Sequence, residues 1–418
     1  MAKTTRLAND DARQLIGLAA LARAAFAGAD LRPLRAHLLD RLARDENDAN
    51  ALMDLATVLQ LMGQRECGLS LQALALELQQ VYRLRSPGNP TGIRLLSFLS
   101  PGDLAENNAV EFLVEGSDIT LYMLYVNPDK PLPAALPEHD LAMVAVAESD
   151  RNRPLLRHIE KLVKTWPRPV LCASERIARL SRDGACRLLR SAPGTVVPLT
   201  ARVDRGTLGG IGRAELAVTT LVPDGDFPII VRPVDSQKGI GLMKLDRPCA
   251  IQDYLKTRPE SDFYVARYVD YRGQDGRFRK YRIVLIDGRP YLCHVAIAEN
   301  WMVHYLSAGM VESVEKRAEE AQSFANFDDG FARRHRNALR AIAERLELEY
   351  VGIDCGETAE GELLIFEVDS GMTVHAMDPV DIFAYKQPQM RKVFRAFRQM
   401  LIDTCAQRAT TSPLRSGS

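Results

Sequence analysis

The stretch FPIIVRPVDSQKGIGLMKL, residues 227–245, sets two apolar runs that predict β-strands on either side of a short polar loop. Its charged and small residues include Arg232, Ser236, Lys238, Gly239 and Gly241. Backbone N–H groups and a cationic side chain at such a loop can bind an anion, and glycine lets the backbone approach it closely. The stretch lacks the GxxxxGK pattern of a Walker loop, and it lacks the third glycine and following helix of a dinucleotide-binding fingerprint. Taken alone, it indicates no more than a β-turn.

Three acidic residues far along the chain add a second feature. Asp354 ends the apolar run LEYVGIDC, and Glu367 and Asp369 lie two positions apart in ELLIFEVDSG. A spacing of two on a strand places both carboxylates on one face, and a hairpin between the two runs would bring Asp354 to the same place. Oxygen ligands of this kind suit magnesium better than zinc. The alternative is an exposed strand face with incidental acids. The apolar residues around the acids favour burial, and a buried cluster of unpaired carboxylates requires cations.

Composition limits the class of protein. The chain has 418 residues, 46% of them hydrophobic and 26% charged, which is typical of globular proteins with about two to four domains. Its 54 basic and 54 acidic residues balance, so no overall charge favours nucleic acid or an anionic membrane. Seven scattered cysteines indicate reduced thiols. The N-terminus has no apolar signal core, and no apolar run reaches about 18 residues, so we expect a cytoplasmic protein that uses neither nucleic acid nor membrane as a partner.

The residue pattern divides the chain into a multidomain α/β and α+β protein. Leu and Ala at spacings of three and four predict an α-helical region from about residue 10 to 84, and RSPGNPTG at 85–92 predicts a linker. Short buried runs alternating with helical patterns then predict a small parallel α/β domain with a last strand at Pro169–Cys172. Two hairpins, one of them turning at Asp287-Gly288, predict an antiparallel α+β region after it. The expected domains are 1–88, 89–195 and 196–405, followed by a disordered tail over 406–418.

Within the helical region, ANALMDLATVLQLMGQRECGLSLQALALEL resembles one unit of the tetratricopeptide repeat in the positions of its large, small and turn residues. Only one unit is clear, whereas about three are needed to bury a solenoid core. The resemblance implies a short repeat-like helical domain packed on the rest of the chain. An unrelated helical bundle is the alternative.

Four motifs together resemble the ATP-grasp superfamily, in particular its carboxylate-amine ligases of the RimK type. PIIVRPVDSQKGIGL is similar to the strand with the phosphate-binding lysine and the lid loop that follows it. DFYVARYVD resembles the strand and hinge that hold adenine and ribose, and YRIVLIDG resembles the strand with the substrate-side arginine. VGIDC and LLIFEVDSG resemble the metal-binding strand pair. The resemblance implies a C-terminal ATP-grasp fold at 196–405, preceded by a Rossmann-like pre-ATP-grasp domain at 89–195.

The resemblance also implies roles for single residues. Arg282 stands at the position of the catalytic arginine, and a surface ion pair on an amphipathic strand is the alternative. Asp354 and Glu367 match magnesium ligands, and Asp369 replaces the usual asparagine. Arg232 and Arg182 stand where phosphate-binding lysines are usual, a change that keeps the charge and adds a planar fork. The residues implied to contact nucleotide are Arg182, Arg232, Ser236, Lys238, Gly239, Gly241, Arg267, Tyr268, Val269 and Asp270. Loop residues Asn300, His304 and His375 are candidate substrate contacts or solvated bystanders.

The function implied is an ATP-dependent ligase that forms an amide through an acyl-phosphate, using ATP and two Mg²⁺ ions, with Mn²⁺ as an alternative. Its partners would be small-molecule or peptide carboxylates and amines. The helical region would recruit a protein partner or form a homodimer. Two other functions stay open: a non-catalytic ATP-binding adaptor, and an ATP-dependent kinase of a small acid.

Overall fold

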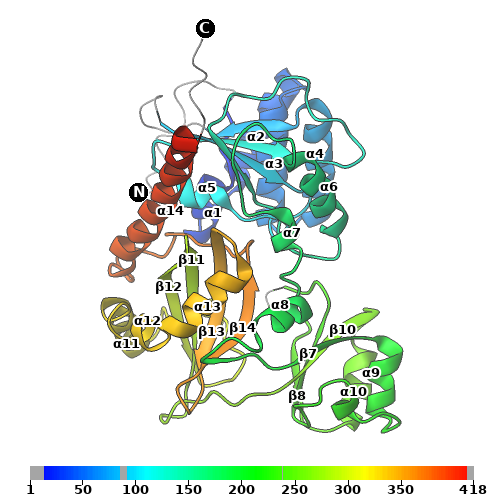
Figure 1. The fold of residues 1–418 in the computed structure, drawn as a ribbon. Coiled ribbons are helices and arrows are strands. Elements are labelled where there is room, and N and C mark those ends of the chain that lie inside the picture. Colours follow the sequence, from blue (N-terminus) through cyan, green and yellow to red (C-terminus); the bar gives the residue numbers. More distant parts are fainter. Residues whose placement is uncertain (1–13, 85–91, 238, 412–418) are drawn as a thin grey trace.

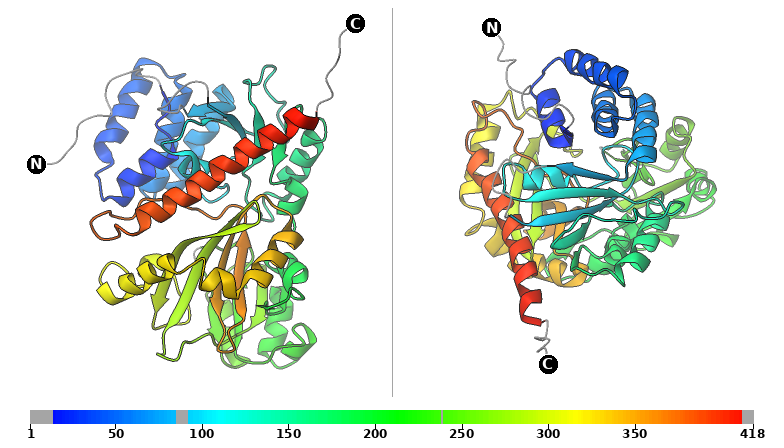
Figure 2. Two further views of the ribbon diagram at one scale, coloured as in Figure 1. Left: turned by 60° about the vertical axis from the view of Figure 1, so that its left-hand side comes forward. Right: turned by 90° about the horizontal axis from the view of Figure 1, so that it is seen from above.

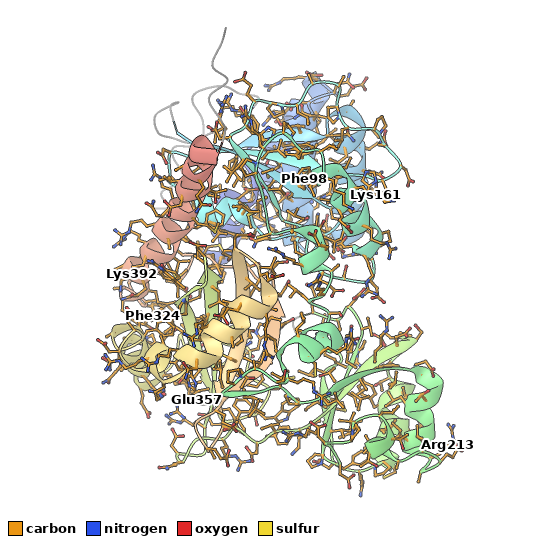
Figure 3. The ribbon with its side chains drawn as sticks, viewed as in Figure 1. Phe98, Lys161, Arg213, Phe324, Glu357 and Lys392 are labelled. Carbon is orange, nitrogen blue, oxygen red and sulfur yellow. The ribbon has the colours of Figure 1, made fainter. Side chains whose placement is uncertain are left out.

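The computed structural model describes residues 14–84, 92–237 and 239–411, and Figure 1 shows three β-sheets with their helices. The N-terminal helices and the first sheet form the upper half, the second sheet lies at the lower right, and the third sheet lies at the lower left. Most of the predicted linker at 85–92 lies outside the described residues, as does Lys238. Figure 3 places Phe98 inside the upper half and Arg213 at the far corner of the lower right part.

Four consecutive helices lie between residues 18 and 78. They are α1 (Leu18–Phe26), α2 (Arg32–Arg44), α3 (Ala49–Leu61) and α4 (Arg65–Leu78). Asp48 caps α3 by accepting a hydrogen bond from the Ala51 N–H at 2.9 Å. Helices α3 and α4 approach closely because Gly68 has no side chain, and a Cβ there would lie 2.7 Å from the Ala56 carbonyl oxygen. The predicted helical region is confirmed as far as Leu78, while its relation to a repeat stays a prediction.

Two buried carboxylates hold the start of α1. Asp54 on α3 accepts hydrogen bonds from the Ile16 N–H at 2.8 Å and the Gly17 N–H at 3.0 Å. Glu111 accepts one from the Ala19 N–H at 3.1 Å. These acceptors satisfy donors that a helix N-terminus leaves free. The helical region is therefore joined to the rest of the chain through buried polar contacts as well as apolar ones.

This arrangement predicts a pH dependence of stability. Burial raises the pKa of Asp54 to about 7, although the Gly17 and Ile16 N–H groups and Arg41 oppose the rise. Burial also raises the pKa of Glu111 to about 7. A folded-state pKa above the unfolded value means that the stabilisation is complete below about pH 4 and is lost as the pH rises through about 7.

We therefore expect the difference in melting temperature between wild type and Asp54→Asn to shrink as the pH is raised from 5 to 8, because asparagine cannot ionise. The neighbouring charges that act on these groups are Arg41, Asp48 and Glu115. Differential scanning calorimetry across this range measures the difference, with the exposed Asp40→Asn as control. A constant difference at every pH would contradict the prediction.

The first sheet has the strand order β1-β3-β2-β4-β5. Its strands are β1 (Val81–Leu84), β2 (Arg94–Leu99), β3 (Thr120–Tyr125), β4 (Leu141–Val144) and β5 (Val170–Leu171). The helices α5 (Val110–Val114), α6 (Arg153–Val163) and α7 (Ser174–Ile177) accompany it. Strands β2 to β5 are parallel, which confirms the predicted parallel sheet and its last strand.

Strand β1 corrects the sequence prediction, which extended the helical region to residue 84. It pairs antiparallel with β3 at the sheet edge. The side chain of Tyr82 is fully buried, and its hydroxyl donates to the Ala75 carbonyl at 2.9 Å. Alternation around this aromatic residue favours a strand over a further helical turn.

The second sheet has the order β7-β10-β8-β9 and is antiparallel throughout. Its strands are β7 (Thr200–Asp204), β8 (Ile229–Pro233), β9 (Met243–Leu245) and β10 (Asp262–Arg267). The helices α9 (Arg205–Gly212) and α10 (Cys249–Lys256) cover it and enclose a separate core, and η1 (Val218–Thr220) lies nearby in the chain. The two apolar runs of the stretch 227–245 are thus β8 and β9, joined by the polar loop 234–242.

The third sheet has the order β12-β11-β13-β14-β6. Its strands are β6 (Thr195–Val196), β11 (Phe278–Ile286), β12 (Arg289–Ala298), β13 (Tyr350–Glu357) and β14 (Leu363–Asp369). The helices of this part are α8 (Arg182–Leu189), η2 (Tyr305–Ser307), α11 (Val314–Ala325), α12 (Phe331–Arg334) and α13 (Arg336–Leu346). Both predicted hairpins, β11–β12 and β13–β14, are confirmed. Positive φ angles of 50° at Asp287 and 73° at Gly288 form the tight turn between β11 and β12.

The last helix, α14 (Lys386–Thr411), lies diagonally between the first and third sheets, as Figure 2 shows. It contacts α5 and β4 above and β11, β12 and α11 below. The disordered tail predicted over 406–418 is wrong for residues 406–411, which continue this helix, and 412–418 lie outside the described residues. The helical spacing of Met390, Phe397 and Leu401, all buried, explains why the helix forms here.

Two further expectations can be compared with the structure. All seven cysteines have free thiols, as their scattered spacing predicted. Within the described ranges, no helix combines the length and apolar character that crossing a membrane would need.

Candidate functional site

Three adjacent strands of the third sheet bring Arg282, Asp354 and Glu367 side by side. Arg282 on β11 lies opposite Asp354 on β13, and Asp354 lies opposite Glu367 on β14. Side chains directly opposite on neighbouring strands leave the same face of the sheet, with Cβ atoms about 4.5–5.5 Å apart. The predicted hairpin and its shared acidic face are confirmed. The role of these residues as metal ligands stays a prediction.

Asp354 is buried, at 3% exposure, and is neutralised by two cations of β11. The Arg282 guanidinium donates from Nε to Oδ1 at 2.8 Å and from Nη2 to Oδ2 at 3.0 Å. Lys280 Nζ donates to Oδ2 at 2.9 Å. Burial alone would raise the pKa of Asp354, but the charges of Arg282 and Lys280 outweigh it and hold the pKa well below its usual range. The carboxylate is therefore ionised throughout the neutral range.

Glu367 forms an ion pair with Arg182, the first residue of α8. Arg182 Nη2 donates to Glu367 Oε1 at 2.7 Å, and Nη1 donates to the Phe366 carbonyl at 3.1 Å. Ser181 caps α8 by accepting from the Gly184 N–H at 3.3 Å, which fixes the start of the helix at this position. Burial opposes ionisation of Glu367, yet the charges of Arg182 and Arg232 lower its pKa.

Asp369 differs from the other two acids because, among the residues that the structure describes, no cation is hydrogen-bonded to it. Its Oδ1 accepts from the Gly371 N–H at 2.7 Å. Burial, followed by the negative charge of Glu367, raises the pKa of Asp369 to about 6. Asp354 and Glu367 thus have the cations that a buried acidic cluster requires. The chain supplies cations of its own, from β11 and α8.

The donor set can be compared with what magnesium requires. Among the residues that the structure describes, no group of three His, Cys, Asp or Glu side chains is arranged to hold a metal ion. Mg²⁺ in nucleotide sites is usually held by one or two carboxylates, with phosphate oxygens and water completing six ligands. The paired carboxylates of Asp354 and Glu367 fit that requirement chemically, whereas an all-protein cage is not present in the described ranges.

Arg232 on β8 contributes a further buried cation. Its Nε donates to Ser236 Oγ at 3.1 Å, and its Nη2 bonds the Ser236 carbonyl. Burial, with the nearby charge of Arg182, lowers the pKa of Arg232 to about 9, while the charge of Glu367 opposes this shift. Arg232, Arg182 and Glu367 thus lie within electrostatic range of one another. Helix α8, which carries Arg182, contacts both β7 of the second sheet and β14 of the third sheet.

The loop 234–242 is shaped by residues with positive φ angles. Gly239 has φ 73° and Gly241 has φ 71°, and a Cβ on Gly241 would lie 2.7 Å from Pro233 Cδ. Glycine is required at Gly241 for space as well as conformation. Tyr254 of α10 donates to the Gly241 carbonyl at 2.7 Å, which ties this end of the loop to the second sheet.

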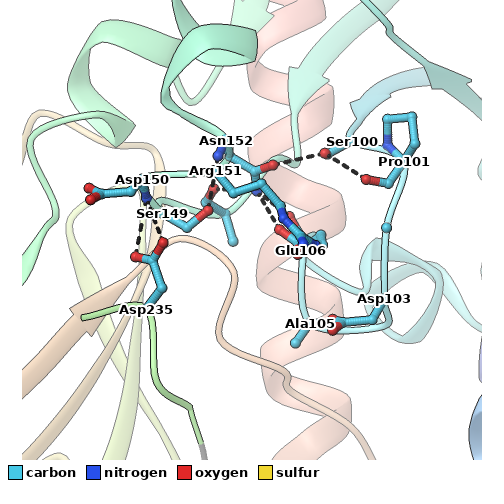
Figure 4. Close-up of polar contacts among 12 residues, drawn as sticks. Ser100, Pro101, Asp103, Ala105, Glu106, Ser149, Asp150, Arg151, Asn152 and Asp235 are labelled. Carbon is cyan, nitrogen blue, oxygen red and sulfur yellow. Dashed lines mark hydrogen bonds and ion pairs between the residues drawn. The ribbon is translucent and has the colours of Figure 1, made fainter. Parts of the chain in front are cut away.

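The same loop reaches the first sheet through Asp235, as Figure 4 shows. Its two carboxylate oxygens accept from the Asp150 N–H at 3.1 and 3.0 Å. Arg202 of β7 donates to Asp150 Oδ1 at 2.9 Å, which adds a second link between these parts. The stretch 227–245 therefore contacts both the second sheet and the segment that follows β4.

The predicted nucleotide hinge, residues 267–270, begins at Arg267, the last residue of β10. The Tyr268 N–H donates to the Pro228 carbonyl at 3.0 Å, and the Tyr268 ring lies edge-on to Trp301 with centroids 5.9 Å apart. Lys244 Nζ lies 4.4 Å from the Tyr268 ring centroid. Arg267 forms an ion pair with Asp224 at 3.5 Å, and Asp270 accepts from the Arg272 N–H at 3.1 Å. All of these contacts are within the protein, so the binding of adenine and ribose by the hinge stays a prediction.

The three candidate substrate residues do not form one group. Asn300 is exposed, and His304 caps η2 through its carbonyl, which accepts from the Ser307 N–H at 3.1 Å. His375 packs between rings of the N-terminal half, with Phe26 and Phe112 centroids both 5.9 Å from its own. Burial lowers the pKa of His375 to about 4. This packing favours a structural role for His375.

Two site residues were missed by the sequence analysis. Lys280 lies two positions before Arg282, so the same alternation that placed Glu367 and Asp369 on one face could have found it. His294 lies opposite Arg282 on β12, and no local pattern marks it. Its ring stacks on Tyr305 with centroids 4.4 Å apart, and its Nε2 is buried with no hydrogen-bond partner in the described part of the chain. Burial and the charge of Arg282 hold the pKa of His294 well below its usual value.

No family model matches the chain, and no curated protein matches it either. Among solved structures, the chain is similar to a RimK domain protein ATP-grasp from Sphaerobacter thermophilus, at 15% identity and a TM-score of 0.42 over 74% of this chain and 99% of that one. It is similar to the VanG D-Ala:D-Ser ligase from Enterococcus faecalis, at 14% identity and a TM-score of 0.44 over 75% and 100%. It is also similar to a D-alanine–D-alanine ligase from Bacillus anthracis, at 13% identity and a TM-score of 0.45 over 76% and 99%.

Proposed function

We propose that the chain is an ATP-dependent carboxylate-amine ligase. The observation that carries the proposal is the strand register that aligns Arg282, Asp354 and Glu367, with Arg182 bonded to Glu367 at 2.7 Å. The motif resemblance of the sequence supplies the class of reaction. A small-molecule or peptide acid and an amine would be the substrates, in the cytoplasm.

The charge of the site supports a polyanionic substrate. Four cationic side chains, Lys280, Arg282, Arg182 and Arg232, lie around Asp354, Glu367 and Asp369. Arginine forks bind phosphate oxygens through two hydrogen bonds, so Arg182 and Arg232 would bind the phosphates of ATP. Lys238, Gly239 and Gly241 would cover them as a lid, anchored through Asp235.

Magnesium would be held by Asp354 and Glu367, with Asp369 as a further ligand, and when bound it would neutralise phosphate charge. The cations of the protein would then need new partners. Arg282 and Lys280 bond Asp354 directly, so nucleotide and metal binding would free their donors for substrate oxygens. In the reaction cycle, Arg282 and Lys280 would thus exchange the carboxylate of Asp354 for oxygens of the substrate.

The proposed reaction has two steps. A carboxylate oxygen of the acid attacks the γ-phosphorus, and the bond from that phosphorus to the ADP oxygen breaks, giving an acyl-phosphate and ADP. The nitrogen of the amine then attacks the acyl carbon, loses a proton and displaces phosphate to form an amide. Arg282 would bind the negative oxygen that develops on the acyl carbon. His294, neutral and opposite Arg282, would keep that arginine oriented.

A second candidate is nucleotide binding without turnover, in an adaptor whose helical region binds a protein. The observation in its favour is that both oxygens of Asp354 are engaged by Arg282 and Lys280. If those ion pairs persisted with nucleotide bound, Asp354 could not act as a metal ligand.

Turnover separates the two candidates. The purified chain would be incubated with Mg-ATP and a matrix of carboxylic acids and amines, and phosphate release would be measured. A ligase is expected to release phosphate only when an acid and an amine are both present, and mass spectrometry should detect the amide. A phosphorylated acid formed without amine would indicate a kinase. ATP binding by calorimetry with no turnover for any pair would favour the adaptor.

A further inference from the structure

A cavity lies between the helical region and the first sheet, away from the charges of the proposed ligase site. Its volume is about 60 Å³, and its walls include α1, α3 and α4 on one side and β2 and β3 on the other. A cavity needs about 10–15 Å³ to hold one water molecule, so this space would admit a molecule of a few heavy atoms. Side chains of Leu121, Met123 and Tyr125, alternate residues of β3, line the sheet side.

Two carboxylates face this cavity with little cationic compensation. Asp54 and Glu111 both line it, and both are buried, at 1% and 7% exposure. Their hydrogen bonds come from backbone N–H groups at the start of α1. Arg41 is the cation whose charge acts on Asp54, but its guanidinium is engaged with Asp48 at 2.8 Å. Burial raises the pKa of each carboxyl to about 7, which shows that neither charge is well compensated.

An unpaired hydroxyl on the opposite wall completes the site. Ser97 of β2 is 1% exposed and lines the cavity, and its Oγ has no hydrogen-bond partner among the residues that the structure describes. A buried hydroxyl without a hydrogen-bond partner is destabilising. Its position opposite two carboxylates means that one small molecule could satisfy all three groups.

We propose that this cavity binds a compact primary ammonium, of the size of methylammonium or ethylammonium. An ammonium group provides three N–H donors and a positive charge, which suit two carboxylates and a hydroxyl oxygen. An anion would be repelled by Asp54 and Glu111. A divalent metal is disfavoured, since the described residues contain no group of three suitable side chains. An apolar molecule would leave the Ser97 hydroxyl unsatisfied.

The bound ammonium would join the helical region to the sheet, because Asp54 belongs to α3 while Ser97 belongs to β2. It would also act on the loop that follows β14. Asn108 lines the cavity and donates from Nδ2 to the Ser370 carbonyl at 2.6 Å. Binding would therefore stabilise the docking of the helices against the first sheet.

Thermal unfolding of the full chain at pH 7 tests the proposal. Methylammonium chloride should raise the melting temperature in a saturable manner, whereas equal concentrations of tetramethylammonium chloride and potassium chloride should not. Tetramethylammonium has the same charge but no N–H donor and a larger volume. Isothermal titration of methylammonium gives the affinity.

Variants then locate the site. Ser97→Val removes the hydroxyl and fills part of the cavity, and Glu111→Gln removes one charge without a change of shape. Each should weaken methylammonium binding at least tenfold, while the exposed Asp40→Asn should leave it unchanged. Ser97→Val leaves both carboxylates and their hydrogen bonds to α1 in place, so it keeps the test valid if Glu111→Gln fails to fold. Equal effects of all three salts, no saturable binding by wild type, or wild-type affinity in Ser97→Val would overturn the proposal. Because the readout is binding, it is independent of ligase activity.

Discussion

Replacing Glu367 with glutamine is expected to lower phosphate release from Mg-ATP about a thousandfold, with little change in melting temperature. Glutamine keeps the shape and one acceptor oxygen for Arg182 but removes the charge that would hold magnesium. A metal ion contributes several kcal/mol of transition-state stabilisation, and each 1.36 kcal/mol corresponds to about a tenfold change in rate. Steady-state phosphate release with saturating acid and amine measures the effect.

The control is Glu362→Gln. Glu362 is exposed and lies directly before β14, five positions before Glu367. It should retain full activity. Calorimetric titration of ATP should show that Glu367→Gln weakens nucleotide binding in the presence of Mg²⁺ more than in its absence. Wild-type turnover in Glu367→Gln would contradict a mechanism that depends on the acidic residues of β13 and β14. A loss of activity that merely follows a loss of folded protein would assign Glu367 to structure.

Replacing Arg282 with methionine is expected to destabilise the folded chain by about 3 kcal/mol, because it leaves Asp354, 3% exposed, with Lys280 as its remaining cationic partner. Removing one member of a buried ion pair typically costs about 3–5 kcal/mol, since the remaining charge is left without compensation. Methionine keeps most of the side-chain length, so the change tests charge more than packing. The shift in urea midpoint and melting temperature measures the loss.

A double-mutant cycle with Asp354→Asn makes this prediction specific. The double variant should be less destabilised than the sum of the two single variants, because the buried charge and its partner are removed together. Arg289→Met, at an exposed position on the neighbouring strand, serves as the control and should change stability by less than about 0.5 kcal/mol. Strict additivity of the two single changes would mean that the ion pair contributes nothing measurable.

The ion pairs also bear on the departures from the expected motif. Lysine was expected at the positions of Arg182 and Arg232. The charges of both arginines lower the pKa of Glu367. A guanidinium can bond a carboxylate and a backbone carbonyl at once, as Arg182 does with Glu367 and Phe366. A lysine ammonium could not span those two acceptors in the same planar geometry. Arg182 therefore stabilises the site without a ligand, in addition to the phosphate binding that we propose for it.

Local sequence patterns were sufficient for most of the secondary structure. Apolar runs and an Asp-Gly turn predicted β11–β12, and the apolar residues around Asp354 and Glu367 predicted β13–β14. These predictions succeeded because strand periodicity and turn chemistry depend on only a few neighbouring residues. Strand β1 was missed since four residues carry little periodic signal. The end of α14 was misplaced because the residues after 405 are polar and resemble a tail.

The residue pattern alone was enough to identify the acidic pair, the glycine-containing loop and the order of the helical, parallel and antiparallel parts. It could not identify which cations neutralise the acids, because Arg182 and Glu367 are 185 positions apart and meet only when α8 packs beside β14. The cavity beside Asp54, Ser97 and Glu111 has the same origin, since its walls come from separate helices and strands. Periodicity reflects interactions within one element, whereas these features depend on how elements pack against each other.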